Sequence, residues 1–309
     1  MENVSNVKDF AAMVKDELLK IYPDRDVTVR EVTKNNGLVL TGITIFTKGC
    51  NISPTIYVDK MFEEYLRGAS LDDLIKGFVQ CYESADLHSN FDVSYVKDFD
   101  KAIDKICLKL VNAERNSELL KKVPHVMFND LAVVFYILVE NGDRDHGTAT
   151  MLVNNDIMNT WGIEYTNEFY ENAKYNTQTL LPATVTDLTD VVKMLAEDDE
   201  SFNLIEDMDV EASAPMYVAS NISRVNGCSV MLYDGVLKEF SKKVGSDLYI
   251  LPSSVHEVIL VPCNKCIDME LNTMLDMVRD INATEVRQDE FLSNHIYKYT
   301  YEADTIEIL

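Results

Sequence analysis

The feature that most constrains the fold is the nine-residue run from Leu131 to Val139, LAVVFYILV, in which every position is apolar. A strand with one face in water alternates apolar and polar residues. A run that is apolar at both alternations therefore predicts a central strand covered on two faces. It is also the longest apolar stretch of the chain, and it falls far short of the roughly 20 residues that a membrane-spanning helix needs. The run indicates the inside of a layered protein.

Amphipathic helices and strands are predicted on both sides of this run. Apolar residues recur at helical spacing in residues 7–18, 71–82, 99–110, 154–161, 166–175, 188–195, 235–243 and 271–278. Strand-like runs occupy residues 27–32, 38–46, 148–153, 217–220, 228–232, 248–251 and 256–261, before a final strand pair. This order predicts an α+β fold of several hairpin-plus-helix modules, with mostly antiparallel sheets packed by amphipathic helices.

Three Asn-Gly dipeptides fall between strand-like runs, at Asn36-Gly37, Asn141-Gly142 and Asn226-Gly227. Asn and Gly tolerate positive φ, so the dipeptide is typical of a tight hairpin turn. Because helical sequence follows each hairpin, we expect one hairpin-then-helix module to occur three times at irregular spacing.

The length and the distribution of acidic residues predict the domain organisation. A chain of 309 residues exceeds the usual single core and is expected to form two or three packed units. The segment from Asp187 to Glu211 contains ten acidic residues and a single basic residue, Lys193. Such a density of like charges cannot be buried. We therefore expect an N-terminal α+β domain (1–123), a central hairpin-plus-helices module (124–196), an acidic exposed linker (197–214) and a C-terminal α+β module (215–309).

Charge and cysteine content exclude several classes of protein. Lys and Arg total 28 against 52 Asp and Glu, a net charge of -24, so nucleic acid and anionic membranes should be repelled. The first twenty residues contain no continuous apolar signal-peptide core. Six cysteines spread over the chain fit reduced thiols better than a disulfide framework. We expect a soluble cytoplasmic protein, whose oligomeric state the sequence leaves open.

Several segments carry a resemblance to a known family. They are NNGLVLTGITI, NISPTIYVDKMFEEYLRG, NDLAVVFYILVE, GSDLYILPSSVHEVILVP and NATEVRQDEFLSNHIYKY. Together they resemble an uncharacterised domain-of-unknown-function family of clostridial gut bacteria, from about the first helix to the last strand pair. More distantly, the order of elements resembles the ytp-operon family of bacilli. The resemblance implies a bacterial origin and an intracellular location, but no reaction.

The strongest catalytic candidates are Ser254 and His256, in the segment Leu-Pro-Ser-Ser-Val-His-Glu. A hydrolase needs a nucleophile and a base within hydrogen-bond reach, and a third group that orients the base. In a strand, Ser254 and His256 would share one face and Glu257 would lie on the other, so these three cannot form a triad by themselves. The alternative is structural: the serines form a turn and His256 begins a buried strand.

Cys263 and Cys266 are a candidate metal or redox pair, because Cys-X-X-Cys is half of a zinc knuckle. A structural zinc site needs four ligands, and the chain has no second Cys-X-X-Cys. Free thiols in a loop are the alternative. We find no Gly-rich phosphate loop, and we expect no cofactor.

Missing catalytic motifs and a strongly acidic composition favour a non-enzymatic protein-interaction or regulatory protein whose partner is another protein. The alternative is a small-molecule or peptide hydrolase that uses the Ser254 and His256 neighbourhood. A minor alternative is an acidic mimic of DNA, which would need ordered rows of carboxylates.

Overall fold

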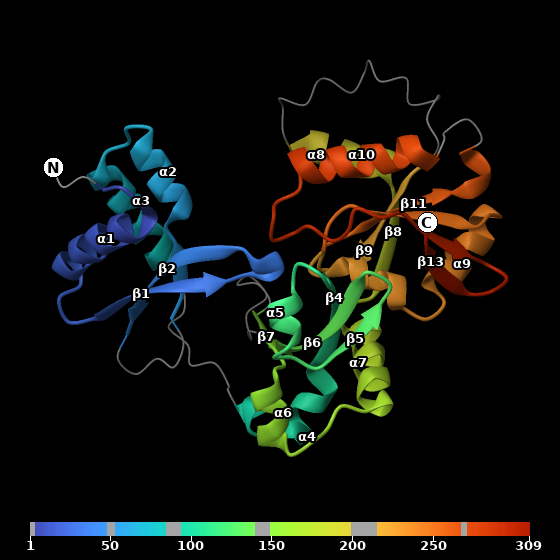
Figure 1. The fold of residues 1–309 in the computed structure, drawn as a ribbon, viewed down its shortest axis with the longest axis horizontal. Helices are drawn as coiled ribbons and strands as arrows, with labels where there is room; N and C mark the ends of the chain where they lie inside the picture. Colours follow the sequence, from blue (N-terminus) through green and yellow to red (C-terminus); the bar gives the residue numbers. More distant parts are fainter. Residues whose placement is uncertain (1–3, 48–52, 85–93, 140–148, 199–214, 267–270) are drawn as a thin grey trace. The chain divides into compact units, whose positions relative to one another are not determined.

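The computed structural model describes residues 4–47, 53–84, 94–139, 149–198, 215–266 and 271–309. These residues form two compact units, the first within residues 4–84 and the second within residues 94–309 (Figure 1). The α+β fold class is confirmed, and every strand pair of the described chain is antiparallel.

The first unit packs three helices on a three-stranded sheet of order β1-β2-β3. Its elements are α1 Val7–Ile21, β1 Asp26–Thr33, β2 Val39–Phe46, β3 Thr55–Tyr57, α2 Asp59–Leu66 and α3 Leu71–Ser84. The Asn36-Gly37 hairpin is confirmed, since both residues take positive φ (59° and 70°) between β1 and β2. The Asn6 side chain caps α1, whose apolar stripe of Phe10, Val14 and Leu18 is buried in the unit's core.

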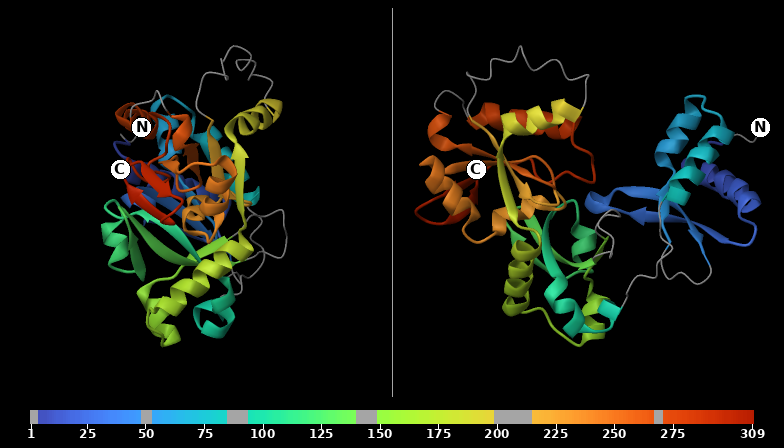
Figure 2. Two further views of the ribbon diagram at one scale, coloured as in Figure 1. Left: turned by 90° about the vertical axis from the view of Figure 1, so that its right-hand side faces the viewer. Right: turned by 180° about the vertical axis from the view of Figure 1, so that it is seen from behind.

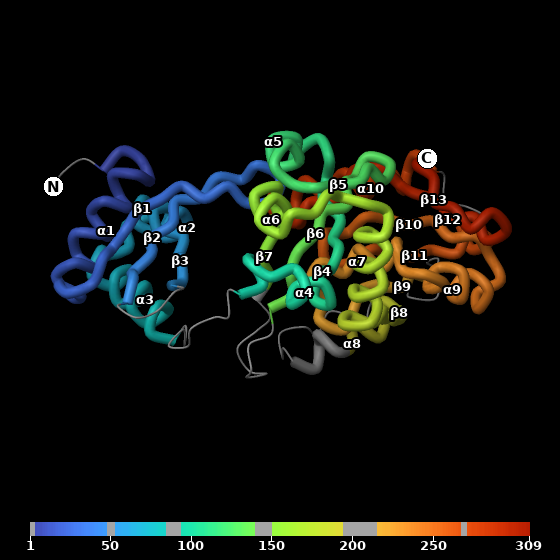
Figure 3. The backbone as a smooth tube through the Cα atoms, turned by 90° about the horizontal axis from the view of Figure 1, so that it is seen from below, coloured from blue at the N-terminus to red at the C-terminus, as the bar shows by residue number. Residues whose placement is uncertain are grey.

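The second unit contains a four-stranded sheet built around β6 Leu131–Val139. This strand pairs with β4 Ile106–Asn112 on one side, and with β5 His125–Phe128 and β7 Ala149–Leu152 on the other. The prediction of a central strand is confirmed, because residues 131–138 are all buried. Helix α7 Asn167–Leu180 runs along β4 (Figure 3), and α6 Asn155–Trp161 precedes it.

The second unit also contains a six-stranded sheet of order β13-β12-β10-β11-β9-β8. Its elements are β8 Ala183–Asp187, α8 Leu188–Asp198, β9 Tyr217–Asn221, α9 Val236–Val244, β10 Leu248–Pro252, β11 Val258–Pro262, α10 Leu271–Thr284, β12 Tyr297–Thr300 and β13 Thr305–Ile308. Leu108 and Phe135 of the smaller sheet share one buried cluster with Ile250, Leu260 and Tyr297 of the larger. The two sheets therefore form a single core.

The helix predicted over residues 99–110 is wrong. The chain forms only a short helix, α4 Phe99–Ala102, a 3-10 turn, and then strand β4. Apolar residues at 106, 108 and 110 also satisfy strand alternation, and seven residues of β4 pair with β6. The pairing with β6, which the local pattern does not contain, decides the conformation.

The hairpin predicted at Asn226-Gly227 is also wrong. Asn226 does take positive φ (53°), but residues Gly227–Leu232 form a 3-10 helix instead of a strand. Strand β9 pairs with β8 and β11. The hypothesis of three equal hairpin modules fails at this point, and the Asn141-Gly142 turn lies outside the described residues.

The predicted domain limits differ from the two compact units. The first limit was placed after residue 123, whereas the units divide between residues 93 and 94. The reason is that β4 (106–112) pairs with β6 and so belongs to the second unit. Of the predicted linker, residues 199–214 lie outside the described residues.

Candidate functional site

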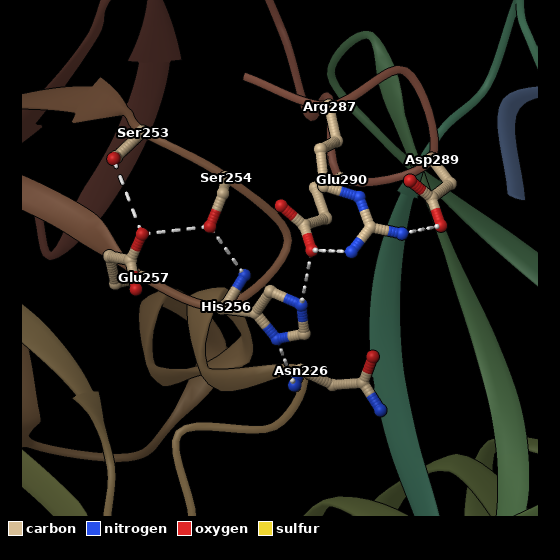
Figure 4. Close-up of polar contacts among 8 residues, drawn as sticks. All are labelled: Asn226, Ser253, Ser254, His256, Glu257, Arg287, Asp289 and Glu290. Atoms are coloured by element: carbon tan, nitrogen blue, oxygen red, sulfur yellow. Dashed lines mark hydrogen bonds and ion pairs between the residues drawn. The ribbon is translucent and has the colours of Figure 1, made fainter. Parts of the chain in front are cut away.

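The candidate catalytic residues lie in the tight loop 253–257 that joins β10 to β11 (Figure 4). Ser254 Oγ donates a hydrogen bond to Glu257 Oε1 at 2.8 Å and accepts one from the His256 main-chain N–H at 3.0 Å. Ser253 Oγ donates to the same carboxylate oxygen at 3.3 Å. Ser254 is only 7% exposed, and both of these hydrogen bonds of its hydroxyl are made within the loop. The hydroxyl therefore stabilises the turn.

The expectation that Ser254 and Glu257 point to opposite faces is wrong. It assumed a strand through residue 256, but β11 begins only at Val258. The intervening residues fold back, so that the Ser254 N–H donates to the Glu257 carbonyl at 3.2 Å. The serine hydroxyl and the carboxylate consequently meet.

The His256 ring contacts groups from two other segments. Its Nδ1 accepts a hydrogen bond from the main-chain N–H of Asn226 at 3.4 Å, and its Nε2 lies 3.9 Å from Glu290 Oε1. Because Nδ1 accepts, a neutral ring carries its proton on Nε2, facing Glu290. The ring is 34% exposed at the side chain, so it is not sealed inside a sheet.

Glu290 belongs to a mixed-charge cluster after α10. Arg287 Nη1 lies 3.4 Å from Glu290 Oε1, and Arg287 Nη2 lies 2.9 Å from Asp289 Oδ2. The Glu290 carbonyl also accepts a hydrogen bond from the Val255 N–H at 2.8 Å. The segment 287–290 is thereby attached to loop 253–257, as Figure 4 shows.

These contacts determine what the loop can do chemically. A nucleophilic serine needs its proton directed at a base with an open path to the substrate. Here the Ser254 proton is directed at Glu257, whose Oε1 is shared with Ser253. The His256 ring instead contacts Asn226 and Glu290. In this arrangement the imidazole is not hydrogen-bonded to the serine that it would have to activate.

Gly227 allows the Asn226 turn to approach this loop. A Cβ atom at Gly227 would lie 2.3 Å from the His256 carbonyl oxygen and 2.1 Å from Ser220 Oγ. Ser220 Oγ donates to that same carbonyl at 2.7 Å. Residue 227 therefore has to be glycine, because the close packing leaves no room for a side chain.

The candidate cysteine pair lies just after β11. Cys263 begins a 3-10 turn, and Cys266 Sγ lies 3.7 Å from the Pro262 carbonyl oxygen. Burial raises the pKa of Cys263 to about 11 and also raises the pKa of Cys266. Such thiols remain protonated at neutral pH. Within the part of the chain that the structure describes, no three His, Cys, Asp or Glu residues gather as metal ligands.

Lys109, in the middle of β4, is a residue that the sequence analysis missed. Its strand neighbours are buried, and burial lowers the pKa of its ammonium group. The signal was present as a single charge inside the run ICLKLVN.

An apolar groove of about 300 Å³ lies near the same loop, on one face of the six-stranded sheet. Helices α8 and α10 lie on this face of the sheet (Figure 2). Leu251, Ile259 and Val261 line it from β10 and β11. Helix α10 contributes Met277 and Ile281, which remain 44% and 49% exposed. Partly exposed apolar side chains around such a groove are typical of a binding surface.

The comparisons with known proteins identify a family but no relative of known activity. A model of a family of unknown function, DUF5688, matches residues 7–301, which confirms the predicted membership of a family of unknown function. No curated protein and no solved structure matches the chain. None of the described helices is both long and apolar enough to span a membrane.

Proposed function

The chain belongs to this family of unknown function, and we propose that it is a non-enzymatic protein-interaction or regulatory protein. The observation that carries the proposal is the groove on the six-stranded sheet, whose apolar lining includes exposed Met277 and Ile281. Exposed apolar side chains that gather around a groove are typical of an interaction site. The net charge of -24 favours a basic protein partner and disfavours nucleic acid.

A capture experiment tests the proposal. The tagged full-length protein, the variant Met277→Glu and the matched variant Met127→Glu are used as baits in extract of the native host. Met127 lies in the same unit, is 56% exposed and is on β5. We expect one protein that is captured by wild type and Met127→Glu, lost with Met277→Glu, and weakened by salt. Equal recovery by all three baits, or recovery of nothing above background, would refute the proposal.

The alternative of a small-molecule or peptide hydrolase has one supporting observation, namely that Glu290 approaches His256 from a distant segment. The hydrogen bond from Ser254 to Glu257 opposes it. A fluorophosphonate probe, which labels activated serines, separates the two functions. We expect no adduct on Ser254, whereas labelling that disappears in His256→Ala would establish the hydrolase.

We further propose a cytoplasmic location in a clostridial bacterium and a distant relationship to the ytp-operon family. The resemblance of the segments quoted above supports the location and the clostridial origin, and the order of the elements supports the distant relationship.

A further inference from the structure

The groove is lined by apolar residues of the β10 and β11 strands and of helix α10. Leu251 and Ile259 face each other across the β10 and β11 pair, and they form the floor. The alternate residues Ile250 and Leu260 enter the shared core on the opposite face. Strand alternation therefore gives the sheet a second apolar face, which α8 and α10 cover only in part.

The dimensions of the α10 wall match a helical ligand. The α10 residues lining the groove run from Met274 to Asn282, which is about 12 Å at 1.5 Å per residue. Apolar side chains at positions i, i+3 or i+4, and i+7 of another helix span about 10 Å. Methionines at 216, 274 and 277 supply adaptable contacts, as in other helix-binding grooves.

The lining also argues against anionic and polar ligands. Of the described lining residues, none carries a charge. Asn282 is one of the few polar residues, and its Nδ2 already donates to the Ser293 carbonyl at 2.8 Å and to Asn294 Oδ1 at 2.9 Å. A fatty-acid carboxylate or a phosphate would find no cation in the groove.

Among the described charged side chains of α8 and α10, three acids outnumber two cations, which favours a basic ligand. Lys193 of α8 lies 3.8 Å from Asp190, and Arg279 of α10 lies 3.8 Å from Asp276, so both cations already face an acid on their own helix. Asp280 has no cationic partner among the described ion pairs. A second copy of the chain would carry the same charge of -24 and would be repelled.

Resting on the function proposed above, we propose that the groove binds an amphipathic helix of a partner protein. Its apolar side chains at i, i+3 or i+4, and i+7 contact β10, β11 and α10. Its Lys and Arg residues flank the groove and face Asp190 of α8 and Asp276 and Asp280 of α10.

A displayed library of 16-residue peptides, randomised at all positions, tests this inference with the full-length protein. Binders are selected on wild type and counter-selected on Met277→Glu, with Met127→Glu as the matched control. We expect binders with helical apolar spacing and net positive charge. Replacing their Lys and Arg by Glu should weaken binding at least tenfold in fluorescence anisotropy, and Met277→Glu should abolish it. Binders with extended apolar spacing or negative charge, or no binder that depends on Met277, would overturn the inference.

Two outcomes separate this inference from the proposed function. If a host protein is captured through Met277 but the selected peptides are not basic helices, the proposed function stands and the inference of a helical ligand is wrong. If basic helices are selected but no host protein depends on Met277, the groove has the inferred chemistry and the proposed function is wrong. A thermal unfolding midpoint equal to that of Met127→Glu shows that Met277→Glu remains folded.

Discussion

Replacing Gly227 by alanine should destabilise the second unit by about 2–4 kcal/mol. The new Cβ would lie 2.1 Å from Ser220 Oγ and 2.3 Å from the His256 carbonyl oxygen. Moving the Ser220 hydroxyl breaks its 2.7 Å hydrogen bond to that carbonyl, which contributes about 1 kcal/mol. Displacing the carbonyl shifts loop 253–257, and overpacking of this kind costs about 1–3 kcal/mol.

The assay uses the single tryptophan of the chain. Trp161 lies in the second unit, where its Nε1–H donates to the Tyr95 carbonyl at 3.0 Å. Its fluorescence during urea unfolding therefore reports on this unit alone. The midpoint and the slope give the change in the free energy of unfolding, provided that the slope stays constant.

Two further glycine variants serve as controls. A Cβ at Gly245 meets no atom within 4 Å, but the residue has φ of +66°, so Gly245→Ala should cost only about 1 kcal/mol of left-handed strain. Gly77 in α3 also has open space. Gly77→Ala should leave the Trp161 transition unchanged and stabilise the first unit by about 0.5–1 kcal/mol. A loss for Gly227→Ala no larger than that for Gly245→Ala would refute the close approach of the two loops.

Three other variants or measurements test the second unit. Tyr297 Oη donates to Asp130 Oδ1 at 2.5 Å, so Tyr297→Phe should cost about 1.5–3 kcal/mol in urea unfolding. The pKa of Tyr297 is raised in the folded state. Its contribution to the free energy of unfolding is therefore complete below pH 10 and is lost above it, where the tyrosine of the unfolded chain ionises. The difference in stability between wild type and Tyr297→Phe should narrow above this pH. Lys109→Met should stabilise the unit by about 1 kcal/mol at pH 7. Because the pKa of Lys109 is lowered, this gain in stability should shrink as the pH rises towards about 10.4, where the lysine of the unfolded chain also loses its proton. A gain independent of pH would contradict the lowered pKa of Lys109. Iodoacetamide at pH 7.5 should label exposed Cys81 faster than half-buried Cys263, whose pKa is raised to about 11, as read by mass spectrometry. Equal rates would contradict the raised pKa of Cys263.

The sequence predicts well where a local pattern has one interpretation. Residues 131–139 are apolar at both alternations, which predicts a central strand, and β6 confirms it. Helix α1 also follows from its own apolar spacing, and the structure adds Asn6 as its capping residue. Residues 99–110 fit both periods, and the choice was made by pairing with β6, which begins twenty-one residues after Leu110. A local pattern cannot contain that pairing.

The candidate site was predictable only in part. Ser254 and His256 were found from residue type, but their hydrogen bonds depend on a turn that strand alternation hid. Asn226 and Glu290 reach His256 from positions thirty and thirty-four residues away in the sequence. Such contacts arise from the packing of the sheet, and no spacing rule indicates them. Gly227 was identified as a hairpin residue, although close packing against His256 is what requires it.

Loop 253–257 links the histidine cluster to the groove, and this connection determines how variants at His256 should be interpreted. Ser253 lines the groove and donates to Glu257, while the ring of His256 holds the Asn226 turn against the same loop. A loss of peptide binding in His256→Ala can therefore arise from a displaced end of the groove, without any contact between histidine and ligand. Glu257→Gln keeps an acceptor for the Ser254 hydroxyl but removes the charge. Binding that survives this change and fails in His256→Ala would show that the groove depends on the His256 ring and not on the charge of Glu257.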